Sequence, residues 1–164
     1  MEKVTFDASE IYQFAIRIEE NGERFYRKVA ESVSENDMKE LFTFLAGEEV
    51  THRRFFEQTV GSLQPYQPEE SFPDEYFSYL RAYADQIVFP PEAERELAGK
   101  KGVGAALEFG IRRELDSIAY YREMMNFIPP DQRKMILTII EQERNHFVRL
   151  SHMKARIQQG GTRA

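Results

Sequence analysis

Cysteine is absent from this chain of 164 residues, which excludes disulfides, thiolate metal sites, iron–sulfur clusters and cysteine nucleophiles. Only three histidines are present, so any metal or catalytic chemistry must depend mainly on carboxylates. The sequence also lacks an apolar run long enough to span a bilayer, and its first residues lack the apolar stretch of a secretory signal. We therefore expect a cytoplasmic protein that has no contact with a membrane.

Positively charged residues are fewer than negatively charged ones, with 22 Lys and Arg against 28 Asp and Glu, which gives a net charge of −6. Surfaces that bind nucleic acid normally carry a basic stripe, so we expect no nucleic-acid partner. The hydrophobic share of 41% and the charged share of 30% are ordinary for a globular protein. The length suits one domain and is short for two, so we assign residues 1–164 to a single domain.

Proline is missing from four long stretches, because five of the seven prolines lie between residues 65 and 91 and two form the pair Pro129-Pro130. Proline costs about 3 kcal/mol inside a helix, so these stretches predict four long helices. The first opens at Asp7, with Glu10 completing a capping box. The others are expected over about 36–59 and 103–127, and from the proline pair to near residue 160.

No stretch shows the sustained alternation of a strand, so the chain is predicted to be all-α. The connector over about 60–100 is too long for a turn, and we expect an aromatic helix from 74 to about 87 and a shorter one after Pro91 that ends at Gly99. Short, long and short connections are typical of a four-helix bundle with one crossover between the second and third helices.

The two halves of the chain resemble each other. A shift of 95 residues places Ile16-Arg17-x-Glu19 over Ile111-Arg112-x-Glu114 and Tyr26-Arg27 over Tyr121-Arg122, and a shift of 94 places Glu49-x-x-His52 over Glu143-x-x-His146. Each half therefore reads as a helical hairpin of the same design, which predicts a bundle with pseudo-twofold symmetry.

One glutamate on each long helix falls on an otherwise apolar face: Glu19, Glu49, Glu114 and Glu143. In the second and fourth helices a histidine follows three residues later, on the same face, as His52 and His146. Isolated buried carboxylates cost several kcal/mol each, and two divalent cations would neutralise four of them. Oxygen-rich ligation with some nitrogen suits iron or manganese, while zinc can compete. The alternative to metal ligation is a satisfied core histidine or a surface ion pair. His152 has no Glu three residues before it, so we expect it to be a surface residue, and Glu20 lies on the solvated face of its helix.

These motifs resemble the di-iron carboxylate site of the ferritin-like superfamily, and most closely its rubrerythrin branch. The resemblance implies an all-α, ferritin-like four-helix bundle that holds two metal ions, with iron expected first and manganese or zinc as alternatives. It further implies that Glu19 and Glu114 are terminal ligands, that Glu49 and Glu143 bridge the metals, and that His52 and His146 cap one metal each.

Tyr26 and Tyr121 match aromatic residues that line such sites, where they hydrogen-bond a ligand or relay an electron; the alternative is a plain core role. The chain departs from typical rubrerythrins in two ways. Ser117 stands where they carry a further Glu, and without cysteine there is no rubredoxin-like module. Electrons must therefore come from a separate donor protein or a small reductant.

The resemblance implies an oxidoreductase that reacts with peroxide or oxygen. Two alternatives remain: an iron-handling or ferroxidase protein that oxidises or buffers Fe(II), and a helical interaction module with a purely structural metal. The aromatic connector carries more apolar area than a surface strap needs, so we also expect a homodimer.

Overall fold

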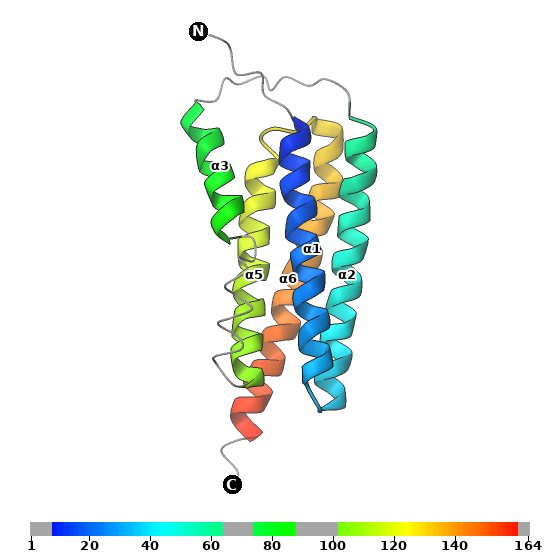
Figure 1. Cartoon of the computed structure of the whole chain (residues 1–164), viewed down its shortest axis with the longest axis vertical. Helices are drawn as coiled ribbons and strands as arrows, with labels where there is room; N and C mark the ends of the chain where they lie inside the picture. The colour runs from blue at the N-terminus through cyan, green and yellow to red at the C-terminus, as the bar shows by residue number, and fades with distance from the viewer. Residues whose placement is uncertain (1–7, 64–73, 88–101, 161–164) are drawn as a thin grey trace.

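The computed structural model describes residues 8–63, 74–87 and 102–160, and all regular structure in these segments is helical. The helices are α1 (Ala8–Ser32), α2 (Asn36–Gly61), α3 (Asp74–Ile87), α5 (Val103–Met124) and α6 (Pro130–Gly160). Figure 1 shows α1, α2, α5 and α6 as a long bundle, which confirms the predicted all-α class. None of these helices combines the length and the apolar character that crossing a membrane requires.

The bundle consists of two antiparallel helical hairpins, α1 with α2 and α5 with α6 (Figure 1). The hairpins meet where α1 contacts α5 and where α2 contacts α6. Helix α3 belongs to the crossover and lies against α5 on the outside of the bundle. The long crossover joins α2 to α5, as the proline distribution predicts.

Three helix ends differ from the sequence prediction. Helix α2 ends at Gly61 rather than near residue 59. Helix α5 ends at Met124 rather than Phe127, because the backbone turns there and Phe127 N–H bonds to the carbonyl of Met124. Helix α6 begins at Pro130, the second proline of the pair. Proline is tolerated at the first helical position, where the backbone N–H has no intrahelical partner to lose. Asp7 and the short helix expected after Pro91 lie outside the described residues.

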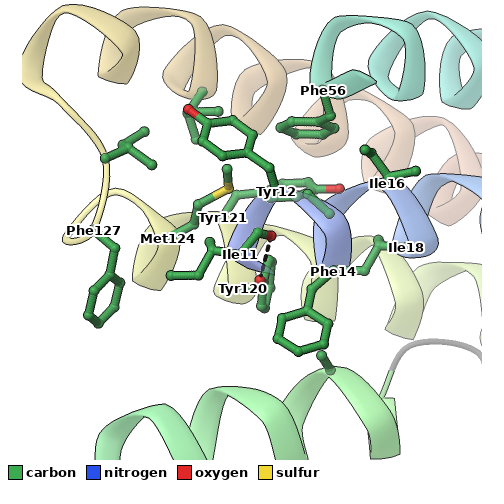
Figure 2. Close-up of a cluster of buried hydrophobic side chains, with 14 of the residues drawn as sticks. Ile11, Tyr12, Phe14, Ile16, Ile18, Phe56, Tyr120, Tyr121, Met124 and Phe127 are labelled. Carbon is green, nitrogen blue, oxygen red and sulfur yellow. Dashed lines mark hydrogen bonds between the residues drawn. The ribbon is translucent and has the colours of Figure 1, made fainter. Parts of the chain in front are cut away.

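The apolar core is divided into two clusters. One gathers residues from the first half of α1, the last part of α2, α3, the end of α5 and the start of α6, including Ile11, Phe56, Leu80 and Ile136. Figure 2 shows part of this cluster, with Tyr12, Phe14 and Tyr120 around α1 and α5. The other gathers the second half of α1, the start of α2 and α5, and the end of α6, including Phe25, Phe42, Leu107 and Leu150.

The interval between the two clusters is polar on all four bundle helices. It holds six of the buried ionisable side chains, and they are the six that the sequence analysis selected: Glu19, Glu49, His52, Glu114, Glu143 and His146. The fold therefore encloses a layer of carboxylates and imidazoles between the two apolar core clusters.

Candidate metal centre

All six predicted ligands point into the bundle, and none is more than 5% exposed. Glu19 comes from α1 and Glu114 from α5, while α2 and α6 each supply a Glu-x-x-His pair. Residues three apart share a helix face, so each pair presents its carboxylate and imidazole to the same space. Glu20 and His152 are exposed, in agreement with the prediction that they lie outside the site.

The first group of potential ligands is Glu19, Glu49, His52 and Glu143, whose ligand atoms all lie within 4.8 Å of one another. His52 Nδ1 is 2.9 Å from Glu143 Oε1 and 3.7 Å from Glu19 Oε2. This imidazole nitrogen therefore faces two carboxylates from two different helices. A single cation placed among them would meet ligands from α1, α2 and α6.

The second group is Glu49, Glu114, Glu143 and His146, again with ligand atoms within 4.8 Å of one another. His146 Nδ1 lies 3.1 Å from Glu143 Oε2, 3.6 Å from Glu114 Oε2 and 3.9 Å from Glu49 Oε1. Glu49 and Glu143 belong to both groups, and the two imidazole rings stack with their centroids 5.8 Å apart. The arrangement is that of two adjacent cation positions joined by two shared carboxylates.

Each unshared glutamate accepts a hydrogen bond from a tyrosine on the opposite hairpin. Tyr121 on α5 donates its hydroxyl to Glu19 Oε1, and Tyr26 on α1 donates its hydroxyl to Glu114 Oε1. The two bonds are related by the internal repeat, because each tyrosine also follows the glutamate of its own helix at the same spacing. The tyrosines thus orient the carboxylates that would bind only one cation each.

The outward nitrogens of the histidines have partners that the sequence analysis missed. His52 Nε2 lies 3.0 Å from Gln142 Oε1, and His146 Nε2 lies 3.8 Å from Glu48 Oε2. Both partners immediately precede a shared glutamate, and the same repeat offset of 94 residues relates them. The sequence signal for these two partners was their position in the internal repeat, directly before each shared glutamate. A histidine that uses Nδ1 for a metal usually directs its other nitrogen to such a partner, which fixes the ring orientation.

The electrostatics of the two groups are strongly coupled. Burial lowers the pKa of His52, but its contacts with carboxylates, chiefly Glu143, outweigh burial and raise the pKa to about 11. His146 is likewise pushed down by burial and raised by Glu114 and Glu143, so that its pKa reaches about 10. Burial and neighbouring carboxylates raise the pKa of Glu114 to about 8 and that of Glu49 well above its ordinary value.

Glu143 behaves in the opposite way. Burial would raise the pKa of this carboxyl, but its close contacts with Glu114 and the two histidines hold the pKa well below its ordinary range. Protons on the histidines and on Glu49 and Glu114 therefore balance negative charge inside the cluster. Divalent cations would replace these protons, since metal ligands must be deprotonated.

Three buried ligand atoms without hydrogen-bond partners indicate that a metal fits the site. Glu19 Oε2, His52 Nδ1 and Glu143 Oε1 have no hydrogen bond of good geometry within the described residues, although all three are inaccessible to solvent. Buried polar atoms are rarely left without a partner, and all three belong to the first group of ligands. Four carboxylates and two imidazole nitrogens form a hard, oxygen-rich donor set, which suits two divalent cations of the iron or manganese type.

Gly22 makes room for one of the shared carboxylates. A Cβ atom at this position would stand 3.2 Å from Glu49 Cδ and 3.3 Å from Glu49 Oε2, closer than side chains normally approach. Gly22 lies three residues after Glu19, on the same inward face of α1. The absence of a side chain here lets Glu49 reach across from α2 to both groups.

A four-helix bundle whose two Glu-x-x-His pairs and two further glutamates enclose adjacent cation positions defines the ferritin-like diiron-carboxylate class of proteins. The sequence model of the rubrerythrin family matches residues 10–154, and the chain belongs to this family.

A solved structure from Thermotoga maritima, described as a candidate ferritin-like diiron-carboxylate protein, is similar to this chain with 28% identity and a TM-score of 0.64. The similarity covers 92% of this chain and 96% of the other. Comparison with the curated proteins gives no match.

Proposed function

We propose that this protein is a di-iron carboxylate oxidoreductase of the rubrerythrin type, which reacts with peroxide or oxygen and receives electrons from a separate donor. The observation that carries the proposal is the pair of four-residue groups that share Glu49 and Glu143. A structural zinc ion is usually held by one closed tetrahedral set of ligands, whereas two adjacent positions with shared carboxylates are suited to chemistry on a two-atom substrate.

Two adjacent iron ions, when bound, supply two electrons and can hold both oxygen atoms of peroxide or dioxygen. The residues of the chain control the orientation of the ligands and the access of water. Tyr121 and Tyr26 hold the carboxylates of Glu19 and Glu114 in place through hydrogen bonds. The apolar clusters on either side of the polar layer keep bulk water away. Hydrogen peroxide takes up two electrons and two protons as it becomes two water molecules.

The test begins with elemental analysis of the protein purified with its native metal. Protein loaded anaerobically with Fe(II) is then mixed with hydrogen peroxide or oxygen, and the ferric absorption is followed before and after a reductant is added. We expect rapid oxidation that the reductant reverses over repeated cycles. A protein that carries zinc and stays redox-silent with iron would contradict the proposal and favour a structural metal.

An iron-handling role is the second candidate, and Ser117 favours it. This residue is buried on the inward side of α5 at the position where typical rubrerythrins carry a further glutamate. The set of six ligands that remains resembles the one in ferritins. Stoichiometry separates the two roles, because retention of iron well beyond the two positions per chain favours iron handling, whereas reversible peroxide-driven oxidation favours the enzyme.

Three further expectations belong with this proposal. Residues 1–164 form one domain in the cytoplasm, the electron donor is a separate protein, and the active form is a homodimer. The dimer is supported by large apolar side chains that the bundle leaves exposed, such as Leu115 of α5 at 49% and Leu137 of α6 at 53%. Light scattering coupled to size-exclusion chromatography measures the mass in solution, and a monomer at micromolar concentration would contradict the dimer.

A further inference from the structure

Four tyrosine rings form a continuous row from the exposed side chain of Tyr79 on α3 to the candidate metal centre, and a fifth ring, that of Tyr76, stacks on Tyr79 beside the row with centroids 6.0 Å apart. The ring centroids of Tyr79 and Tyr83 are 5.9 Å apart, those of Tyr83 and Tyr120 are 6.2 Å apart, and those of Tyr120 and Tyr121 are 6.0 Å apart. Tyr121 then donates its hydroxyl to Glu19. We call these four residues the tyrosine row. It crosses from α3 to α5, and Figure 2 labels its two inner members, the consecutive residues Tyr120 and Tyr121 of α5.

The tyrosine row connects solvent with the interior. Tyr79 is 48% exposed, Tyr83 is half-buried, and Tyr120 and Tyr121 are fully enclosed. Phenol side chains can lose one electron and one proton to a strong oxidant, and electron tunnelling falls steeply with distance. A sequence of short ring-to-ring steps therefore offers a faster path through the protein than one long step.

Within the described segments, the rings that lie next to Tyr26, the other tyrosine of the site, are those of phenylalanines. The ring of Tyr26 lies 5.1 Å from Phe25 and 6.0 Å from Phe42, and the ring of Phe25 lies 4.8 Å from Phe109. Phenylalanine lacks the hydroxyl whose proton loss makes tyrosine oxidisable. The two tyrosine–glutamate pairs match in geometry, but only Tyr121 continues into a chain of oxidisable rings.

The hydrogen bonds of the four hydroxyls differ along the row. Tyr121 donates to the carboxylate of Glu19, and Tyr79 is exposed to solvent. The hydroxyls of Tyr120 and Tyr83 donate to the backbone carbonyls of Ile11 and Asp116, which are very weak bases. The two middle phenols therefore have no good proton acceptor and hold the oxidised state only in passing, whereas exposed Tyr79 can release its proton to water.

We propose that the tyrosine row carries electrons from the protein surface at Tyr79 to the metal centre after peroxide has oxidised it. The inference rests on the proposed function, and peroxide is the oxidant. An electron that leaves the row at Tyr121 would be replaced from Tyr120, Tyr83 and Tyr79 in turn, and the inner phenols keep their protons once the electron is replaced. The net loss is one electron and one proton at Tyr79, and the proton passes to water. One peroxide takes up two electrons and two protons as it forms two waters, so two electrons would pass along the row in succession, and a reductant returns one electron and one proton to Tyr79 after each passage.

The experiment uses the full chain loaded with iron, exposed to hydrogen peroxide without a reductant in the presence of a nitroso spin trap. Peptide mass spectrometry then locates the trapped adducts. We expect an adduct at Tyr79 in the wild-type protein and none in zinc-loaded protein. Tyr83→Phe keeps the ring but removes the oxidisable hydroxyl, so the Tyr79 adduct should fall to background while peroxide is still consumed.

Tyr12→Phe is the matched control, because Tyr12 is a buried tyrosine whose ring contacts Phe56 rather than a member of the row. This variant should keep the Tyr79 adduct at the wild-type level. A Tyr79 adduct that persists at full yield in Tyr83→Phe overturns the inference and leaves the proposed function standing. Wild-type protein that binds iron but does not consume peroxide overturns both.

A second variant tests the row at its exposed end, where folding is not at risk. In Tyr79→Phe the solvent end of the row is removed, so the oxidised state stays inside the protein. The tyrosyl signal seen by electron paramagnetic resonance after peroxide addition should then decay more slowly than in the wild type. An unchanged decay means that the oxidised state leaves by another route, which overturns the inference.

Discussion

The unshared glutamates of the site show how a bundle interior accommodates charge at the level of single residues. Each accepts a hydrogen bond from a tyrosine on the other hairpin, Glu19 from Tyr121 and Glu114 from Tyr26. Hydrogen bonds to charged groups contribute about 1.5–3 kcal/mol each, which offsets only part of the cost of burying a carboxylate. Protons on neighbouring groups, or cations, must supply the rest.

Replacing a shared glutamate should remove the whole centre. Glu49→Ala or Glu143→Ala is expected to abolish binding of the metal pair, because each carboxylate belongs to both groups of ligands. Metal content after loading and desalting, measured by elemental analysis, checks this. Glu20→Ala is the control, since Glu20 is exposed on α1 next to Glu19 in sequence. Loss of metal in Glu20→Ala together with retention in Glu19→Ala would place the functional face of α1 one residue away.

Gly22 allows a second test of the shared carboxylate of Glu49, in which the carboxylate is displaced rather than removed. Gly22→Ala introduces a Cβ 3.2 Å from Glu49 Cδ, so the carboxylate must shift and metal affinity should fall by roughly tenfold or more. Gly47→Ala on α2 meets nothing within 4 Å and should raise the unfolding free energy by about 1 kcal/mol through helix propensity, with metal affinity unchanged. Calorimetric titration with Mn²⁺ and urea unfolding measure the two effects. Equal affinities in both variants would show that Glu49 does not depend on the space beside Gly22.

At the scale of elements, α3 is attached to the bundle by its apolar side. Leu80 and Ala84 are buried in the core cluster that also contains Phe14 and Tyr120, while Tyr79 on the same helix faces solvent. An ion pair between Arg81 and Glu10, with atoms 2.7 Å apart, joins α3 to α1 at the surface. The crossover helix is therefore part of the core and not only a connection, and this attachment holds the outer half of the tyrosine row in place.

Truncating Leu80 measures this attachment. Leu80→Ala should lower the unfolding free energy by about 3 kcal/mol, because it leaves a cavity between α3 and the bundle. Ser78→Ala, at an exposed position of the same helix, should change it by less than about 0.5 kcal/mol. Urea unfolding followed by circular dichroism compares the two variants. If they were equally stable, α3 would contribute nothing to the core.

At the scale of the whole molecule, the enclosed cluster couples stability to pH and metal. The raised pKa values of His52, His146, Glu49 and Glu114 mean that these groups bind protons more tightly in the folded than in the unfolded chain. Their contribution to stability is complete below the unfolded pKa values and is lost as the pH rises through the folded ones. The lowered pKa of Glu143 acts in the opposite direction, but only at acidic pH below its ordinary value.

The metal-free protein should therefore become less stable as the pH rises from about 5 to 8, a range that spans the unfolded pKa of histidine and reaches the folded pKa of Glu114. Bound cations replace the protons, so the loaded protein should lose little stability over the same range. Thermal melts of metal-free and manganese-loaded protein should diverge by several degrees as the pH rises. A gap that stays constant or narrows would mean that the carboxylates do not act as one buried cluster.

Much of this fold follows from local features of the chain. The positions of proline predict where the long helices lie, and the helical repeat predicts that Glu19 faces inward while Glu20 faces solvent, as the structure shows. The Glu-x-x-His pairs are equally local, because residues three apart share a face in any α-helix. The helix ends were less predictable, since α5 stops at Met124 and α6 starts on a proline, where backbone turns compete with helix continuation.

The sequence by itself determined which side chains face the interior, because helical periodicity relates each residue only to its own helix axis. It does not state how far one helix is shifted or rotated against the next. Only the packing of the hairpins decided that Tyr121 meets Glu19 and that His146 meets Glu48, since these contacts join residues about a hundred positions apart. The tyrosine row likewise exists only because α3 lies against α5 and places Tyr83 beside Tyr120.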